Sequence, residues 1–320
     1  MSDQEIKPEY EPSELVYNWW KFMSVASVVN IALYAKVLLS KDHGSGKSTR
    51  SYNTSMKWLA LPYVLQCAWR SFWPEVYNDR FVLWDCWMSS VFIGRGLATI
   101  GEITWIFQVG LAMMRANMEI KLLKGGERNQ LTWVESAVNY CSMASIAMCI
   151  LAEFFCNHGM FVENYFYNVI ETTLWTLALG ILIPCCVYLL HELQTISDQY
   201  SKGITTVDVS QTRLYLIMMF LVCVAFVIEL CQDHIPMCYR MWKLKEAAGT
   251  PDRDLLEGIK SSMFDRIPTA AWEHWENDWF WMASYFSAGV WTSIFMATGP
   301  RIHINTGKGV SAEDQDKKDQ

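Results

Sequence analysis

The sequence predicts an all-α fold, a polytopic membrane helical bundle of about seven transmembrane helices whose N-terminus is non-cytosolic. Hydrophobic residues fill 52% of the 320 positions, and long apolar stretches alternate with charged connections. A helix rises about 1.5 Å per residue, so about 20 apolar residues cross the roughly 30 Å hydrocarbon core of a bilayer. The chain also contains 16 Trp, a residue that gathers at membrane interfaces. Together these observations predict repeated membrane crossings.

Apolar length sets the limits of each predicted span. The spans cover about residues 17–40, 58–73, 87–114, 133–155, 169–190, 214–230 and 279–298. The first begins near Trp19 and Trp20 and ends at a polar run. The second is short and contains Pro62, which a membrane helix tolerates where neighbouring groups satisfy the freed carbonyl. The third follows a compact polar turn that begins after Pro74.

The four later spans are separated by connections of unequal length. The fourth begins at Trp133, after a charged, glycine-containing segment that is typical of a loop. A short aromatic and polar linker leads to the fifth span. The longest connection, 232–278, precedes the last span, and its Lys-rich and Glu-rich centre predicts a helix exposed to water. Segments 1–16 and 299–320 are predicted to be disordered tails.

The distribution of positive charge predicts the orientation, because Lys and Arg in short connections resist translocation. The connections after the first, third and fifth spans hold most of these residues, which places them in the cytosol and the N-terminus on the other side. One signal opposes this prediction. Asn53, Thr54 and Ser55 form a glycosylation sequon in a connection predicted to be cytosolic. Such triplets are common by chance, so the charge distribution decides.

Composition argues against several classes of protein. The net charge of -7 lacks the basic excess that phosphate-backbone binding requires, so no nucleic-acid partner is predicted. The 10 Cys include no pair with the two-residue separation of a zinc ribbon or redox motif. The six His are scattered, with none paired on one helix face. We therefore predict neither a metal site nor a cofactor.

Ionisable side chains within the spans are the first candidates for function, because a charge at membrane depth is costly unless it is paired or hydrated. Arg95 and Glu102 are seven residues apart in the third span, which puts them on one helix face with Thr99 between them. Two interpretations stay open: a polar seam, or an ion pair that only fixes helix packing. For Glu135 and Glu153, near the ends of the fourth span, a packing role is favoured.

Further polar and aromatic side chains gather at the predicted non-cytosolic mouth of the bundle. Convergence of titratable groups among apolar ones is typical of a binding site. The catalytic candidates are Glu171, Glu229, Asp233 and Glu102. The substrate-binding candidates are Arg70, Asp85, Arg95, Asn168, His234, Trp175, Glu276 and Trp279. For the segment 272–279 the competing interpretation is an interfacial belt of rings and hydrated carboxylates.

The favoured hypothesis is a membrane-embedded enzyme of lipid metabolism that acts on a lipid or isoprenoid substrate, through carboxylates at the non-cytosolic mouth. A carboxyl group in apolar surroundings keeps its proton and acts as a general acid, so the chemistry is expected to be acid-initiated. Amide variants of Glu171, Glu229 and Asp233 are each expected to abolish activity. The predicted partners are membrane lipids and a hydrophobic small-molecule substrate or a cation.

The alternative hypothesis is a proton-coupled or cation-coupled transporter or channel. Its polar path would contain Arg95, Glu102, Glu171 and Glu229, because intramembrane carboxylates serve proton relays as readily as catalysis. Acids that end in a closed site near one face favour the enzyme, and acids that connect both faces favour transport. A scaffold whose charges only hold helices together is a third hypothesis. The chain is predicted to be an integral, multi-pass protein of an endomembrane or the plasma membrane.

Overall fold

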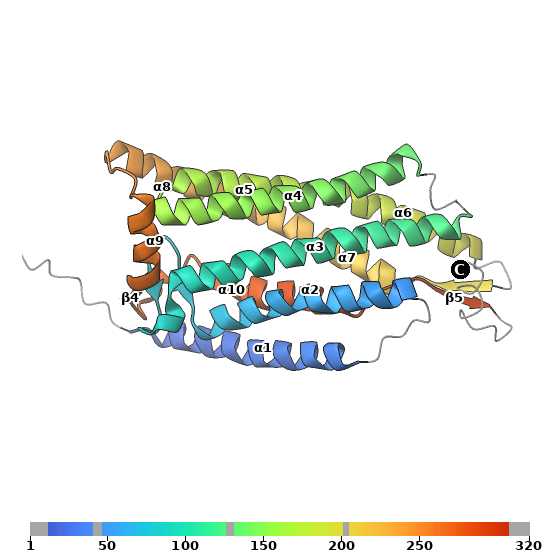
Figure 1. Ribbon diagram of the computed structural model, residues 1–320, viewed down its shortest axis with the longest axis horizontal. Helices are drawn as coiled ribbons and strands as arrows, with labels where there is room; N and C mark the ends of the chain where they lie inside the picture. Colours follow the sequence, from blue (N-terminus) through green and yellow to red (C-terminus); the bar gives the residue numbers. More distant parts are fainter. Residues whose placement is uncertain (1–11, 41–46, 126–130, 201–204, 307–320) are drawn as a thin grey trace, which may run out of the picture.

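The computed structural model describes residues 12–40, 47–125, 131–200 and 205–306, and most of these residues are helical. Long helices run side by side along one axis of an elongated bundle (Figure 1). The first four are α1 (Glu14–Leu39), α2 (Lys47–Phe72), α3 (Val91–Leu123) and α4 (Trp133–Val162), and α5 (Tyr165–Gly180) is followed directly by α6 (Leu182–Tyr200). The π-helix η2 (Leu230–His234) joins α7 (Ser210–Glu229) to α8 (Ile235–Ala247). The π-helix η4 (Tyr285–Gly289) joins α10 (Trp279–Ser284) to α11 (Val290–Ala297). The predicted all-α class is confirmed.

Within the described residues, five helices are long and apolar enough to cross a membrane. They are Glu14–Leu39, Val91–Leu123, Trp133–Val162, Tyr165–Tyr200 and Ser210–Ala247. The shortest of these helices has 26 residues, whereas about 20 suffice to cross the hydrocarbon core. These helices suggest a multi-pass membrane protein.

The outer helix α1 exposes apolar side chains and buries polar ones. Phe22 and Val25 are 58% and 65% exposed, whereas Asn30 is only 3% exposed. The Asn30 amide donates to the backbone carbonyl of Phe286 and accepts a hydrogen bond from Trp291 Nε1. Soluble proteins rarely combine a large exposed apolar face with buried polar side chains, so the two features together are informative. The outward face of α1 is therefore suited to contact with lipid.

One end of the bundle, the α9 end, is closed by α9 (Leu255–Phe264) and a small sheet. α9 lies across the ends of the long helices (Figure 1). The three strands have the order β1 (Glu75–Val76), β2 (Phe81–Val82) and β4 (Ile267–Pro268), and the 3-10 turns η1 (Trp87–Ser89) and η3 (Trp272–His274) belong to the same connections. β2 is antiparallel to β1 and parallel to β4. The sheet thus joins the α2–α3 connection to the segment before α10.

The opposite end, the β3–β5 end, contains a second small sheet. β3 (Thr205–Asp208) pairs antiparallel with β5 (His303–Thr306). β3 lies between α6 and α7, and β5 follows α11, so the pairing connects parts of the chain that are about 100 residues apart.

Helix α3 lies inside the bundle and contacts α2, α4, α6 and α11. Small residues allow these close contacts. A Cβ atom added at Gly110 would lie 2.6 Å from Ile146 Cδ1 of α4, so a larger residue would require the Ile146 side chain to shift. Arg95, Glu102 and Gln108 of α3 are consequently buried.

Several observed helices are longer than the predicted spans. α2 begins at Lys47, α6 continues to Tyr200, and α8 ends at Ala247. Hydropathy marks the apolar part of a helix only, whereas polar residues continue the same helix beyond that part. The connection 232–278 therefore begins as a continuation of α7. Asn53 of the sequon is buried within α2.

The predicted C-terminal tail differs from the structure over its first residues. Residues 303–306 form β5, although 299–320 was predicted to be disordered. The hydrogen bonds of β5 come from β3, a partner that composition near the C-terminus does not reveal. Residues 1–11 and 307–320 of the predicted tails lie outside the described residues.

Candidate functional site

Arg95 of α3 binds two carboxylates inside the bundle. Its Nη2 atom donates to Glu153 Oε2 of α4 at 2.5 Å and to Glu102 Oε2 of α3 at 3.4 Å. The side chains of Arg95 and Glu153 are 3% and 2% exposed. The ion pair that the spacing of Arg95 and Glu102 allowed is therefore present, and a second carboxylate shares it. Removing one partner of a buried ion pair typically costs about 3–5 kcal/mol, because the other charge is left uncompensated.

Arg70 and Glu75 form a second pair beside the first. Arg70 Nε lies 3.8 Å from Glu75 Oε1, and both side chains are almost completely buried. The ring of Tyr77 contacts both arginines, with its centroid 4.8 Å from Arg70 Cζ and 5.3 Å from Arg95 Cζ. The ring of Phe286 lies 5.0 Å from Arg70 Cζ. We call Arg70, Glu75, Tyr77, Arg95, Glu102 and Glu153 the acid–arginine cluster.

Gly94 allows the Glu75 carboxylate to lie against α3. A Cβ atom at position 94 would lie 1.7 Å from Glu75 Oε1, whereas a Cβ atom at Gly96 would meet nothing within 4 Å. The carboxylate occupies the volume that any larger residue at position 94 would need. Glycine at this position therefore determines where the Glu75 side chain lies.

Several buried polar atoms of the cluster have no hydrogen-bond partner among the described residues. They are Arg70 Nε and Nη2, both carboxylate oxygens of Glu75, the Tyr77 hydroxyl, Arg95 Nε and Glu153 Oε1. Nearly all buried polar groups in proteins are hydrogen-bonded to protein, water or ligand. The cluster is therefore suited to hold water or a polar group of a ligand between its side chains.

Two carboxyl groups in the connections at the α9 end have pKa values above those of ordinary carboxyl groups. Burial raises the pKa of Glu75 to about 8, although the guanidinium charges of Arg70 and Arg95 act in the opposite direction. Burial also raises the pKa of Asp278, which accepts a hydrogen bond of 2.6 Å from Trp281 Nε1. At neutral pH the Glu75 carboxyl is thus a proton donor, because its pKa lies above the ambient pH.

Glu171 of α5 borders the cluster. Asn168 Nδ2 donates to Glu171 Oε2 at 3.1 Å, and the Cys156 thiol of α4 is also hydrogen-bonded to this carboxylate. The charge of Arg95 acts on Glu171. The structure therefore brings together two of the four catalytic candidates, Glu171 and Glu102.

Glu229 and His234 form a separate pair at the rim of the site. His234 Nδ1 lies 2.8 Å from Glu229 Oε1, and both side chains are about 30% exposed. The imidazole ring lies 6.3 Å from the ring of Trp281. The charges of Glu171 and Asp278 also act on His234. This pair is near the buried carboxylates and reaches the surface.

The remaining candidates lie apart from the cluster. Asp85 pairs with Arg266 at 3.1 Å and is 65% exposed. The exposed candidates also include Asp233, Glu276 and Trp279. Trp175 packs against the hydrophobic core. The roles predicted for these residues stay predictions.

Sequence reasoning missed two members of the cluster. A packing role was favoured for Glu153, and Tyr77 was not considered. Glu75 was counted among the polar residues at the non-cytosolic mouth, but no catalytic or binding role was predicted for it. Glu153 carries the same signal as Glu102, namely a carboxylate within an apolar helix. The two π-helices were not predicted either: η2 directly follows Glu229, and η4 contains Phe286. Single π-helical turns frequently mark functional sites.

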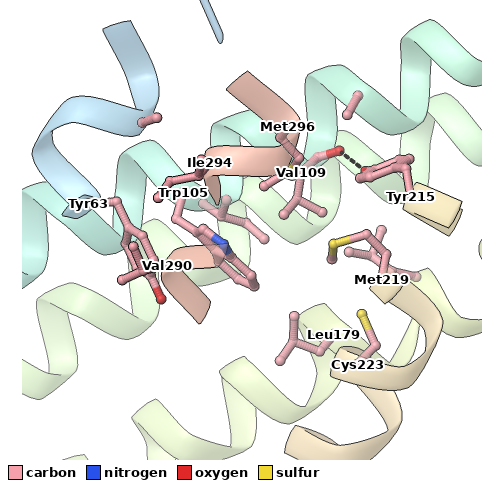
Figure 2. Packing of buried hydrophobic residues seen from close by; sticks show 14 of the residues in the cluster. Tyr63, Trp105, Val109, Leu179, Tyr215, Met219, Cys223, Val290, Ile294 and Met296 are labelled. Atoms are coloured by element: carbon pink, nitrogen blue, oxygen red, sulfur yellow. Dashed lines mark hydrogen bonds between the residues drawn. The ribbon is translucent and has the colours of Figure 1, made fainter. Parts of the chain in front are cut away.

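An apolar layer lies between the cluster and the β3–β5 end. Figure 2 shows ten labelled residues of this layer, Tyr63, Trp105, Val109, Leu179, Tyr215, Met219, Cys223, Val290, Ile294 and Met296. Trp105 follows Glu102 by about one helical turn, and Leu179 follows Glu171 by about two. None of the ten side chains is charged at neutral pH. The layer therefore separates the acid–arginine cluster from the charged residues buried toward the β3–β5 end, Lys57, Lys121 and Glu135.

Two surface hollows lie outside the cluster. An aromatic one is lined by Trp20, Phe72, Trp73 and Trp84. A polar one of about 500 Å³ lies at the α9 end, where Arg253 Nη1 pairs with Glu163 Oε1 at 3.1 Å. In the described part of the chain, no three His, Cys, Asp or Glu side chains are arranged to hold a metal ion.

Comparisons of the chain with protein-family models, with curated proteins and with solved structures found no match. The chemistry of the site is therefore the basis on which a function is proposed. A fold class such as a helical bundle hosts many unrelated activities and does not select one of them.

Proposed function

We propose that the chain is a multi-pass membrane enzyme that acts on a lipid or isoprenoid substrate by acid-initiated chemistry. The acid–arginine cluster is the observation that carries this proposal. It holds carboxyl groups and arginines, buried among aromatic rings near one end of the bundle. A substrate dissolved in the bilayer can approach such a site between helices, without crossing water.

The proposed arrangement in the membrane has seven transmembrane helices and a non-cytosolic N-terminus. α2 and the helix α10–α11 would join the five long apolar helices as spans. The charge distribution of the connections supports this orientation. The α9 end, with the cluster next to it, would then face the non-cytosolic side.

The chemistry follows from the surroundings of the carboxyl groups. A carboxyl group buried among apolar groups holds its proton more strongly than one in water, which suits it to protonate a substrate. The guanidinium of Arg95 would then stabilise the carboxylate that remains on Glu102 or Glu153. The ring faces of Tyr77 and Phe286 would stabilise positive charge on the substrate, by about 0.5–2 kcal/mol per contact.

The position of the cluster favours an enzyme over a transporter. A transport path needs polar groups that connect both faces of the membrane. Here the apolar layer drawn in Figure 2 separates the acid–arginine cluster from the Lys121–Glu135 pair, which is buried toward the β3–β5 end. Gln108 and Ser293 form a neutral hydrogen bond at this depth, and a neutral pair does not continue a path of titratable groups.

The first test identifies the reaction. Membranes of cells with and without the gene are compared by untargeted lipid analysis, and the purified full chain is then given the lipids that differ. We expect a substrate that accumulates without the gene and is converted by the protein in detergent. Proton or cation flux through proteoliposomes, without lipid conversion, would support the transporter instead.

The second test assigns the acids. The variants E102Q, E153Q and E171Q should each lower the rate of conversion by about 100-fold or more, which is the usual contribution of a general acid. E246Q is the matched control, because Glu246 is 58% exposed and pairs only with Lys243 among the described residues. Each variant is first checked for membrane insertion and a single peak in size-exclusion chromatography. Wild-type rates in all three well-folded variants would remove the cluster from the mechanism.

A further inference from the structure

Buried donors and acceptors without partners lie on three neighbouring side chains, Arg70, Glu75 and Tyr77. Arg70 is 2% exposed and Glu75 is 1% exposed. Two guanidinium nitrogens of Arg70, both oxygens of Glu75 and the Tyr77 hydroxyl have no hydrogen-bond partner among the described residues. Contacts between the side chains place these atoms around one small region. A group that both donates and accepts hydrogen bonds would satisfy them.

The charge of the surroundings selects the kind of group. The positive charges of Arg70 and Arg95 stand beside the carboxyl groups of Glu75, Glu102 and Glu153. The cluster therefore holds more acidic groups than basic ones. An anionic ligand such as a phosphate would be placed among these acidic groups, and burying such a charge is costly. A neutral oxygen would accept hydrogen bonds without this penalty.

We propose that Arg70, Glu75 and Tyr77 form a subsite for a neutral oxygen function, a hydroxyl, carbonyl or epoxide, at one end of an otherwise apolar substrate. Arg70 Nε and Nη2 donate to the oxygen, and the Glu75 carboxyl donates its proton to it. This inference deepens the proposed function, on which it rests, by naming the substrate class and a further catalytic residue.

The proton transfer balances without a co-reactant. The O–H bond of the Glu75 carboxyl breaks, and a new O–H bond forms on the substrate oxygen. Glu75 becomes a carboxylate beside the Arg70 guanidinium, and the substrate carries the positive charge. In an epoxide the C–O bond then breaks, its electron pair stays on the hydroxyl oxygen, and the positive charge moves to carbon. Loss of a C–H proton to a carboxylate of the cluster forms a C=C bond and completes an isomerisation. The proton consumed at the start is thus replaced by one released at the end.

The position of Glu75 supplies a sharp test, because it depends on Gly94. G94A places a methyl group 1.7 Å from the observed position of Glu75 Oε1, so the carboxyl must move. G96A makes the same substitution two residues along the same helix, where the added Cβ meets nothing within 4 Å. Both variants change helix propensity in the same way, but only G94A displaces the Glu75 carboxyl.

The experiment measures binding by the purified full chain in detergent. Three chain-matched probes are compared: farnesol with a hydroxyl, farnesoic acid with a carboxylate, and farnesene with no oxygen. Wild type and G96A should bind farnesol about tenfold or more tightly than either other probe, equivalent to about 1.4 kcal/mol or more. G94A, E75Q and R70Q should bind all three probes about equally.

Each other result would overturn the subsite. Tighter binding of farnesoic acid would indicate an anion site, and equal binding of all three probes to wild type would indicate an apolar groove only. Equal selectivity in G94A and G96A would show that the position of Glu75 does not matter. The measurement needs no turnover, so oxygen-selective binding without lipid conversion would contradict the proposed function and leave the subsite in place.

Discussion

At the scale of single residues, the main result is that both arginines of the cluster pair with an acidic residue from a different part of the chain. Arg95 of α3 pairs with Glu153 of α4, and Arg70 of α2 pairs with Glu75 of β1. Such pairs are expensive to form in a low-dielectric interior, and replacing them by apolar residues often stabilises a protein. Retaining several of them next to unpartnered polar atoms is more consistent with a site than with a role in packing.

The buried carboxyl of Glu75 should make stability depend on pH. Its pKa is 4.5 in the unfolded reference state and about 8 when folded. Between these values the folded protein binds one more proton than the unfolded chain, so stability falls as pH rises from about 4.5 to about 8. Above about pH 8 the contribution of Glu75 no longer changes.

Thermal unfolding of the purified protein in detergent checks this prediction at several pH values from about 5 to about 9. E75Q cannot titrate at this position, so its unfolding midpoint should fall less steeply than that of wild type. E246Q, which changes an exposed carboxylate, should keep the wild-type slope. Parallel curves for E75Q and wild type would show that Glu75 titrates normally.

At the scale of elements, α9 is held on the bundle by direct backbone packing. A Cβ atom at Gly258 of α9 would lie 1.7 Å from the carbonyl oxygen of Phe161 in α4. The preceding loop adds a hydrogen bond of 3.0 Å from the Arg253 amide to the Val162 carbonyl. Since a backbone atom cannot rotate away as a side chain can, this contact leaves no room for adjustment.

We predict that G258A releases α9 from the end of α4. The added methyl group should destabilise the protein by about 1–3 kcal/mol, as overpacking typically does. Hydrogen–deuterium exchange should increase in the segment 250–268 while the exchange of α3 stays low. G180A is the control, because a Cβ atom at Gly180 meets nothing within 4 Å. Unchanged exchange of 250–268 in G258A would refute the rigid contact.

At the scale of the whole molecule, side chains are distributed to suit lipid outside and polarity inside. Apolar residues such as Phe22 and Phe154 are exposed, whereas Arg95, Glu153 and Asn30 are buried. The hydrophobic effect does not hold helices together inside a bilayer, so close packing and hydrogen bonds between helices carry that task. The buried polar contacts of α3 with its neighbours fit this requirement.

Orientation can be tested by adding glycosylation sites at the two ends. A248N creates an Asn-Gly-Thr sequon after α8 at the α9 end, and Q199N creates an Asn-Tyr-Ser sequon near the end of α6 at the β3–β5 end. Both positions are exposed. Expressed in microsomes, A248N should be glycosylated and Q199N should not, because the N-terminal side is predicted to be non-cytosolic. The opposite pattern would invert the proposed orientation.

Properties that depend on residues near one another in the chain can be predicted without a structure. Apolar runs predict helices that can cross a membrane, since crossing requires a length of apolar helix and no distant partner. The spacing of Arg95 and Glu102 predicts a shared helix face, because helix periodicity is local. The ends of helices such as α2 and α6 were not predicted, because each helix continues beyond its apolar stretch into polar residues.

Only the tertiary structure decided which of the many polar residues form one cluster. Glu153 joins Arg95 across 58 positions, and Glu75 lies against α3 because Gly94 leaves space for it. Asp233 is as acidic as either residue, yet it is exposed. Every charge at membrane depth is a candidate for function. Whether two such charges meet depends on how helices distant in the sequence pack together. Hydropathy and spacing along one helix do not predict that packing.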